Sequence, residues 1–373
     1  MKVDPLCTPG SVRIAVLGST YPRTPSDHEV PWLREWVKRL AARGYEVLVI
    51  APAYQGLDDH VIDGVPVRRF RYAPGRWEML THGEGAPNKL KKNPILKLLT
   101  LSYLMAGVFA VWKICRRERI DILHVHWPFP HGLMALLPAR LNGVKVVSTC
   151  HSAEFTLAAP SKLACSLLAA SLRQSDAITA NSAHTAKLVR DLSGLTARII
   201  PWGATIKLSS QEKVIPQEVP LLLFSGRLIE RKGVNFLLRA MPLILAHRKV
   251  RLVITGDGHC RAEWENLARE LGLHESVTFA GFVSNDELSS LFRSCSVYVH
   301  PAIYDSKGDT EGQGVVLVEA LSNWRPVVAS KVGGIVDVIK DGETGLLVPE
   351  KNPEAIAKAV LRLLENPDRK SVV

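Results

Sequence analysis

The sequence lacks the cysteine spacing that binds zinc or builds a disulfide framework. Its six cysteines are scattered, with no C-x-x-C pair, so neither a zinc knuckle nor a disulfide-stapled small fold is indicated. Glycine and proline account for only 26 and 23 of the 373 residues, which excludes collagen-like and low-complexity chains. The first ten residues contain Asp4 and two prolines but no apolar core. We therefore expect no signal peptide and a cytoplasmic protein.

Acidic residues are scarce in the first half of the chain. The net charge is 47 − 36 = +11, and all of it falls in residues 1–205, which hold 26 basic and 15 acidic residues. Residues 206–373 hold 21 of each. The excess is greatest in residues 68–119, where 12 basic and three acidic residues give +9. This asymmetry predicts that the first half meets something anionic.

The basic region contains an apolar run, Leu98–Trp112, of fifteen residues without a formal charge. Crossing a bilayer takes about 20 residues, so the run is short for a transmembrane helix. Two compatible interpretations remain: a core helix packed on a sheet, and a segment that lies on an anionic membrane, at the inner face of the membrane. DNA binding would also explain the charge, but no recognition helix, zinc finger or aromatic-basic interleaving accompanies it.

Short β-branched runs alternate with amphipathic stretches along most of the chain. Strands are predicted at 12–17, 46–51, 65–70, 122–125, 144–148, 177–180 and 199–201, and again at 221–224, 250–254, 277–280, 297–299, 327–329 and 345–348. Helices are predicted between them, which favours parallel strands with crossover helices. The fold class is therefore α/β, with two doubly wound Rossmann-like domains at 1–204 and 221–373 joined by a polar linker at 205–220. Ligands of such a fold bind at the carboxyl ends of the strands, here in a cleft between two facing domains.

Two cations follow the first predicted strand of the second domain. Arg227 and Lys232 lie between that strand and a helix, and a helix N-terminus already favours anions. The pattern is compatible with a diphosphate clamp, and the alternative is an ordinary basic loop.

Two carboxylates, Glu311 and Glu319, are eight residues apart in a segment that opens a helix. Glu311 is expected in the loop and Glu319 about two turns into the helix. Gly312 and Gly314 let a ligand approach the backbone closely, and a carboxylate accepts hydrogen bonds from sugar hydroxyls. The alternative is an N-cap acid and an unrelated helix acid.

Histidines follow two strands of the first domain. His151 comes directly after the strand at 144–148, where it is predicted to hydrogen-bond a ligand or move a proton. His124 and His126 face the same side of their strand, with Trp127 next to them. No carboxylate stands near enough in sequence to favour a metal, so we expect His126 to line the acceptor side of the cleft.

These motifs, in this order, resemble glycosyltransferase family 4 of the GT-B superfamily. The second domain contributes the segments 226–233, 256–258, 281–283, 311–320, 326–334 and 341–348, together with Pro301. The first domain contributes 44–52, His124-x-His126, His151 and 200–203. The resemblance covers nearly the whole chain.

The resemblance implies transfer of a sugar from a nucleotide-diphosphate sugar to an acceptor hydroxyl, with retention of configuration and no metal or other cofactor. Arg227 and Lys232 would bind the diphosphate, Glu319 the ribose and Glu311 the transferred sugar. His151 would contact the donor sugar, and Phe282 and Val283 would lie near the base. Gly312, Gln313 and Gly314 complete the implied donor loop. The catalytic set is Glu311, His151, Arg227 and Lys232, and the expected acceptor is a lipid-linked saccharide or polysaccharide.

The chain departs from the family pattern at several points. No glycine lies between Gly18 and Gly44, where relatives often carry Gly-Gly facing the donor phosphates, so Arg23 or Ser26 would substitute. Gln313 stands where an aromatic residue is common. The sequence also ends at residue 373, before the further helices that relatives usually have. Two alternatives therefore stay open: a sugar-nucleotide epimerase, and a non-catalytic nucleotide-sugar-binding partner of another transferase.

Overall fold

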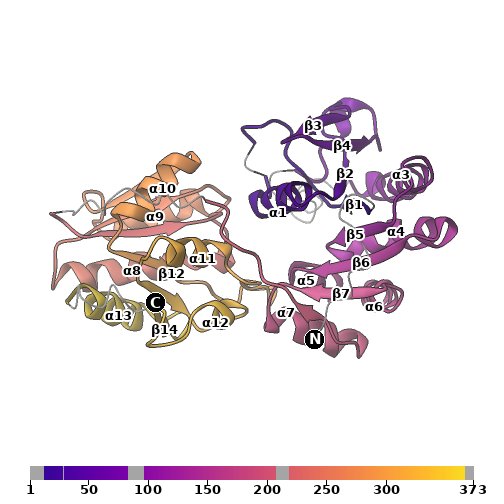
Figure 1. Cartoon of the computed structure of the whole chain (residues 1–373). Coiled ribbons are helices and arrows are strands. Elements are labelled where there is room, and N and C mark those ends of the chain that lie inside the picture. The colour runs from indigo at the N-terminus through magenta and orange to yellow at the C-terminus, as the bar shows by residue number, and fades with distance from the viewer. Residues whose placement is uncertain (1–11, 28, 83–95, 207–217, 366–373) are drawn as a thin grey trace. The chain divides into compact units, whose positions relative to one another are not determined.

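The computed structural model in Figure 1 describes residues 12–27, 29–82, 96–206 and 218–365. The chain divides into two compact units, Met1–Ile200 and Pro201–Val373. The predicted linker at 205–220 lies largely outside the described residues, as do Lys89, Lys91 and Lys92 of the basic region.

The first unit is built on an eight-stranded sheet. Its strands are β1 (Arg13–Leu17), β2 (Glu46–Pro52), β3 (His60–Ile62), β4 (Val65–Phe70), β5 (Ile122–His126), β6 (Lys145–Cys150), β7 (Ala177–Ala180) and β8 (Arg198–Ile199). They are arranged in the order β3-β4-β2-β1-β5-β6-β7-β8. All neighbours are parallel, as predicted, except that the short strand β3, which sequence analysis missed, pairs antiparallel with β4.

Helices cover both faces of this sheet. Successive apolar side chains of its strands point to opposite faces, so both faces must be buried against other elements. The helices are α1 (Pro31–Ala42), α3 (Leu96–Arg117), α4 (Pro128–Asn142), α5 (Ala153–Ala158), α6 (Lys162–Arg173) and α7 (Ala183–Ser193), with a 3-10 turn, η2 (Gly75–Trp77). On β1, Ile14 and Val16 pack with α1, whereas Ala15 and Leu17 pack with α3 and α4. Figure 1 shows α3 and α4 side by side.

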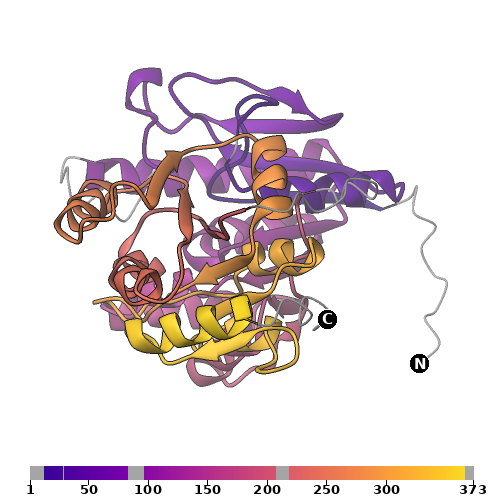
Figure 2. The ribbon, with the colours of Figure 1, turned by 90° about the vertical axis from the view of Figure 1, so that its left-hand side faces the viewer.

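The second unit repeats this plan with six parallel strands. They are β9 (Leu221–Ser225), β10 (Arg251–Thr255), β11 (Val277–Gly281), β12 (Val297–His300), β13 (Val327–Ser330) and β14 (Leu346–Val348), in the order β11-β10-β9-β12-β13-β14. The turn η3 (Glu230–Lys232) precedes the helices α8 (Val234–Leu245), α9 (Arg261–Glu270), α10 (Asn285–Ser294), α11 (Val315–Ser322), α12 (Ile335–Val338) and α13 (Pro353–Glu365). Helices α8 and α13 pack together on one face, as Figure 2 shows, and α10, α11 and α12 pack on the other.

In both sheets the strand order reverses near the centre of the sheet. The chain first builds outward on one side, and then returns to place β5 beside β1 and β12 beside β9. In doubly wound sheets, ligands bind outside the carboxyl ends of the strands at this switch point. The fold therefore singles out the ends of β9 and β12 in the second unit, and of β1 and β5 in the first.

Helix α3 contains the apolar run that admitted two interpretations. Its buried residues Leu96, Tyr103, Val111 and Cys115 belong to the core of the first unit, so its packing on the sheet is confirmed. The segment Leu98–Arg117 is also long and apolar enough to cross a membrane by length and composition, and 22% of its most apolar part is buried.

Candidate active site

The switch point of the second unit brings together the residues that follow β9 and β12. Arg227 lies at the end of β9 and is exposed, whereas Lys232, at the end of the turn η3, is only 6% exposed. Both lie just before α8, whose first N–H groups favour an anion. The expected arrangement of two cations at a helix N-terminus is therefore present.

Gly233 fixes the approach of this loop to the end of β12. It has a positive φ of 61° and caps α8, a conformation that glycine adopts without steric cost. A Cβ atom built there would lie 2.1 Å from the carbonyl oxygen of Pro301. Any other residue at this position would clash with Pro301, so the close approach of the two loops requires glycine.

A buried ionic network joins the loop after β9 to Glu311. The Nζ atom of Lys232 donates a hydrogen bond to Oε2 of Glu311. Nε2 of His300 lies 3.2 Å from the same oxygen, and Nη1 of Arg231 lies 3.5 Å from Oε1. Lys232 and Glu311, which sequence analysis placed on the diphosphate and the sugar, thus contact each other directly.

Burial and the mutual interactions of the charged side chains shift the pKa values of this network. Burial alone would raise the pKa of Glu311, but the Lys232 ammonium and the Arg231 guanidinium outweigh burial and hold that pKa well below its usual range. Burial lowers the pKa of Lys232, and the carboxylate of Glu311 opposes the shift. Burial and the nearby Lys232 also lower the pKa of His300, so its imidazole is neutral at physiological pH. The network holds an ionised Glu311 against fixed cations.

Sequence analysis missed Arg231 and His300. His300 is the last residue of β12 and is completely buried, with its Nδ1 3.2 Å from the hydroxyl of Tyr298. Arg231 also donates to the carbonyl oxygen of Thr310, at 3.0 Å. Their position at the switch-point strands was a usable signal, but neither residue stands out by spacing.

Glu319 lies on α11 and is 6% exposed. Its Oε1 accepts a hydrogen bond of 2.5 Å from the hydroxyl of Thr205. Burial raises the pKa of Glu319, and the bond from Thr205 opposes the shift. Its carboxylate therefore already accepts a hydroxyl donor, the chemistry that was predicted for it with ribose.

Gln313 forms hydrogen bonds to the backbone at the start of the second unit. Its Oε1 accepts from the backbone N–H of Trp202, and its Nε2 donates to the carbonyl oxygen of the same residue, both at 2.8 Å. Thr205 and Ile206 likewise attach to this unit, so residues 201–204 lie with the second unit and not with the first. The side-chain amide of Gln313, predicted to bind the donor, thus already forms hydrogen bonds to Trp202.

The other predicted donor residues lie in two loops of the second unit. Gly312 is buried, and Gly314 caps α11 with a positive φ of 81°. Phe282 follows the edge strand β11 and is 72% exposed, and Val283 is half-buried beside it. Phe282 thus has a largely exposed aromatic side chain, the type of group on which a base can stack.

The first unit gathers aromatic rings at the ends of β5 and β6. His151 is half-buried, and its Nε2 lies 3.1 Å from Nδ1 of His126. The ring of Trp127 lies 4.7 Å from that of His151, and the ring of Trp32, from α1, lies 4.9 Å from it. His126 is completely buried, so it contacts His151 and has no surface of its own with which to line an acceptor site.

These histidines are neutral at physiological pH. Burial lowers the pKa of His151 to about 3, with His124 adding to the shift. Burial and the neighbouring histidines hold the pKa of His126 well below its usual range, and burial lowers that of His124 to about 4. His151 is therefore a neutral imidazole, which can donate or accept a hydrogen bond but carries no charge.

The backbone beside His151 is strained. Trp127 and Ser152 have positive φ values of 55° and 86° although neither is glycine, and such conformations cluster at functional sites.

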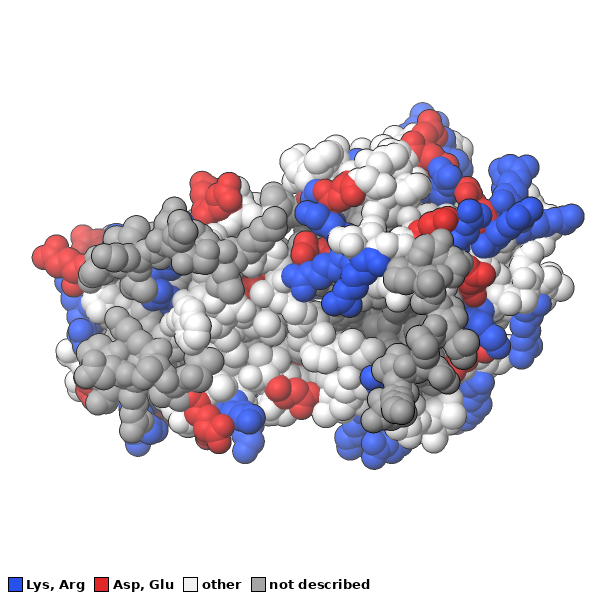
Figure 3. All heavy atoms as spheres, in the orientation of Figure 1, with Lys and Arg blue, Asp and Glu red and all other residues white. Residues whose placement is uncertain are grey.

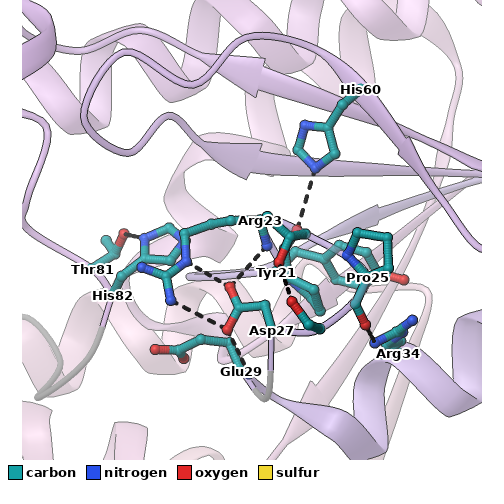
Figure 4. A network of polar contacts seen from close by, with 12 residues as sticks. Tyr21, Arg23, Pro25, Asp27, Glu29, Arg34, His60, Thr81 and His82 are labelled. Atoms are coloured by element: carbon teal, nitrogen blue, oxygen red, sulfur yellow. Dashed lines mark hydrogen bonds and ion pairs between the residues drawn. The ribbon is translucent and has the colours of Figure 1, made fainter.

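The first loop of the first unit is held by side chains where relatives often have Gly-Gly (Figure 4). Arg23 forms a two-pronged ion pair with Asp27, with Nε–Oδ2 at 2.6 Å and Nη2–Oδ1 at 3.2 Å. Its guanidinium also lies over the ring of Tyr54, 5.0 Å from its centroid. The hydroxyl of Ser26 lies 3.1 Å from that of Thr24 and is exposed. The charge of Arg23 is thus already balanced, which leaves Ser26 as the more open of the two predicted substitutes.

Within the described residues, no group of three or more His, Cys, Asp or Glu side chains is placed to hold a metal ion.

Two family models match consecutive parts of the chain. Residues 32–207 match "Glycosyltransferase Family 4", and residues 205–372 match "Glycosyl transferases group 1". Together they extend over both units.

Curated relatives agree with these matches. The chain is 39% identical over 175 residues to an uncharacterized glycosyltransferase of Methanocaldococcus jannaschii, covering 45% of this chain and 43% of that protein. It is 29% identical over 336 residues to the phosphatidyl-myo-inositol mannosyltransferase of Mycobacterium leprae, covering 88% and 81%. The first of these alignments thus spans less than half of the relative.

Solved structures share the fold. Sucrose-phosphate synthase from Thermosynechococcus elongatus superposes with a TM-score of 0.74 at 21% identity, covering 96% of this chain and 90% of that one. The Anabaena protein HepE in complex with UDP-glucose superposes with a TM-score of 0.68 at 16% identity, covering 96% and 91%.

Proposed function

We infer, because the chain belongs to the GT-B glycosyltransferases of the group 1 and family 4 type, that it transfers a sugar from a nucleotide-diphosphate sugar to an acceptor hydroxyl. The predicted family, the two-domain GT-B fold and the class of enzyme are confirmed by the comparisons. The epimerase and the non-catalytic partner are not favoured by them.

The observation that supports the donor site best is the pairing of Lys232 with Glu311 at the switch point. A buried ammonium has three N–H donors, and Glu311 uses one of them. The others can be shared with phosphate oxygens while the ion pair persists. Arg227, exposed at the end of β9, would bind the second phosphate as the donor enters. The pair therefore connects the leaving group to the carboxylate assigned to the sugar.

Each remaining donor contact follows from its place in the second unit. Glu319 would accept the ribose hydroxyls, with Thr205 as the group they join or replace. Phe282 and Val283 would face the base, and Gly312 and Gly314 would let the donor approach the backbone before α11. Arg231 and His300 would position Glu311, since both contact its carboxylate. The solved complex of HepE with UDP-glucose supports a nucleotide-sugar ligand for this fold.

The reaction breaks the bond between the anomeric carbon and the phosphate oxygen. Lys232, Arg227 and the N-termini of α8 and α11 would stabilise the negative charge that develops on the diphosphate. The acceptor oxygen forms the new bond to the anomeric carbon, and its proton passes to the departing phosphate oxygen on the same face. This course would retain the anomeric configuration and need no metal. His151, neutral and held by His126, would hydrogen-bond the donor sugar.

The acceptor side is assigned to the first unit. A lipid-linked saccharide or a polysaccharide fits the basic character of that unit, and the Mycobacterium leprae relative is named for a lipid acceptor. We propose that the enzyme works in the cytoplasm at the inner face of an anionic membrane.

A thermal-shift screen against UDP-, GDP-, ADP- and TDP-sugars tests the proposed donor class. One nucleotide series should raise the melting temperature, because a ligand that binds only the folded state stabilises it. Lys232→Ala should then lower turnover with that donor about 100-fold, whereas Lys340→Ala, an exposed lysine of the same unit, should not. Transfer should persist in EDTA, and the product should keep the donor's anomeric configuration. No stabilisation by any nucleotide sugar, or undiminished turnover of Lys232→Ala, would contradict the proposal.

A further inference from the structure

Helix α3 carries an exposed apolar face opposite the one it buries. Its exposed side chains Leu98, Leu101, Met105 and Phe109 are 79%, 68%, 63% and 61% accessible. Their spacing of three, four and four residues puts them on one side of the helix. Soluble proteins expose single apolar side chains commonly, but a continuous apolar patch marks an interaction surface.

The neighbouring helix also exposes large apolar side chains. Leu137 and Leu141 of α4, which packs beside α3, are 59% and 66% exposed. We call these six residues of α3 and α4 the α3–α4 face. None of them is charged, and the ring of Trp112 contacts Phe109 at the carboxyl-terminal end of the α3 row.

Cations border the α3–α4 face at the same end. Arg116 lies over the ring of Trp112, 5.7 Å from its centroid, and Lys113 and Arg117 are exposed beside it. Figure 3 shows blue side chains above and below an uncharged area at the right-hand edge of the first unit, where α3 and α4 lie in Figure 1.

Three other described cations of the basic region already have polar partners. Arg68 pairs with Glu118 and Asp59, and Arg71 pairs with Glu78 and Asp58. Arg69 is buried and donates to the carbonyl oxygens of Tyr21 and Pro22, in the loop after β1, and of Pro52, at the end of β2. Among described residues, the exposed cations at the end of α3 (Lys113, Arg116, Arg117 and Arg119) form no ion pair. Arg76 is also exposed and lies over the ring of Trp77. Most of the exposed cations of the region that form no ion pair among described residues therefore lie at the carboxyl-terminal end of α3.

We propose that the α3–α4 face docks on an anionic bilayer, with its apolar side chains among the lipid headgroups and Lys113, Arg116 and Arg117 against lipid phosphates. This inference deepens the membrane location proposed above and rests on it for its biological sense. Apolar side chains on one face, flanked by basic residues, are the pattern of helices that lie in the membrane interface. Because Tyr103, Val111 and Cys115 are held in the core of the first unit, α3 would lie along the bilayer surface rather than cross it.

Co-sedimentation with lipid vesicles tests the proposal on the full chain without donor. Binding to phosphatidylcholine vesicles that contain phosphatidylglycerol should exceed binding to phosphatidylcholine alone, and should weaken as salt is added. Leu101→Gln with Phe109→Gln should weaken binding about tenfold, because burial of two large apolar side chains is lost. The matched control is Val61→Gln with Ile199→Gln, two exposed apolar residues of the same unit, and it should bind as the wild type does.

A second pair of variants tests the cationic border. Arg116→Gln with Arg117→Gln should reduce binding to the anionic vesicles and flatten its salt dependence. Arg43→Gln with Lys187→Gln, two exposed cations elsewhere in the unit, should change it far less. Unaltered melting temperatures would show that all variants are folded.

Three results would overturn the proposal. They are absence of wild-type binding to anionic vesicles, binding by Leu101→Gln/Phe109→Gln equal to that of its control, and self-association that this variant abolishes without any vesicle binding. Sugar transfer to a soluble acceptor, measured without vesicles, separates the two claims. Vesicle binding can fail while transfer persists, and transfer can fail while vesicle binding persists.

Discussion

At the scale of single residues, Glu319 shows that a group suited to donor binding can lower the stability of the donor-free protein. Burial raises the pKa of this carboxyl above its ordinary value. A group with a raised folded-state pKa favours folding below its unfolded-state pKa and loses that contribution as the pH rises. The ionised form that accepts hydroxyl donors is thus the less stable one in the donor-free protein.

Glu319→Gln should therefore raise the melting temperature of the donor-free protein at neutral pH, and the gain should shrink as the pH falls. The same variant should bind the nucleotide donor about tenfold more weakly, because an amide accepts fewer hydroxyl hydrogen bonds than a carboxylate. Melting curves with and without nucleotide over a pH series would measure both effects. Glu354→Gln, an exposed residue on α13, serves as the control. Destabilisation without donor at neutral pH would refute this assignment of Glu319.

The buried ion pair of Lys232 and Glu311 also links the stability of the protein to donor binding. Loss of one member of a buried ion pair commonly costs about 3–5 kcal/mol, because the other charge is left without its partner. The variant Lys232→Ala should therefore lose stability as well as turnover. This cost could not be predicted from the sequence, in which nothing indicates that these residues, 79 positions apart, contact each other.

At the scale of elements, glycine-dependent contacts join the loops of the donor site. Gly333, in the loop after β13, has a positive φ of 52°, and a Cβ atom there would lie 2.2 Å from the carbonyl oxygen of Glu311. The N–H of Gly334 donates to the same oxygen at 2.9 Å. The position of Glu311 thus depends on the close approach of a neighbouring loop.

Gly333→Ala should lower both stability and turnover. The positive φ costs about 1–2 kcal/mol with any side chain, and the forced displacement of the Glu311 backbone adds about 1–3 kcal/mol. Gly342→Ala is the matched control, since its φ is 78° but nothing lies within 4 Å of the added Cβ. Denaturant unfolding and turnover should show a larger loss for Gly333→Ala on both counts. Equal losses would mean that the contact with Glu311 is unimportant.

The extent to which the sequence predicts the elements varies with their length. The strand β4 has the predicted ends, and the helix α6 has the ends of the helix that the sequence predicts at 162–173, because each combines a clear period with strong flanking signals. The three-residue strand β3, the six-residue helix α5 and the four-residue helix α12 were not predicted. Such short elements depend on tertiary contacts and contain too few residues to show a period.

For the whole molecule, the sequence predicted both parallel sheets, ligand binding at the carboxyl ends of their strands, and two cations after β9. Periodicity and strand-end motifs suffice for that, because parallel strands direct their carboxyl ends to one edge. Contacts between distant segments could not be predicted from the sequence in the same way. The bracing of Trp202 by Gln313 and the contact of His300 with Glu311 arise only once the strands are ordered.

Donor binding should protect one part of the molecule most. If the second unit holds the nucleotide, hydrogen exchange with saturating donor should slow in residues 225–234 and 298–315, which follow β9 and β12. Residues around α3 should keep their exchange rates, because the proposed membrane face has no part in donor binding. Protection confined to the first unit would contradict the assignment of the donor to the second.

The most direct test of the central claim compares two ligands of one variant. The affinities of Lys232→Gln for the nucleoside diphosphate and for the matching nucleoside should be measured by calorimetry, with Lys340→Gln as the control. Because Lys232 is assigned to the phosphates, its loss should weaken diphosphate binding about tenfold or more while nucleoside binding is retained. The nucleoside thereby reports that the site is still folded. Undiminished diphosphate affinity, or an equal loss for both ligands, would contradict the claim that this buried ammonium binds the leaving group.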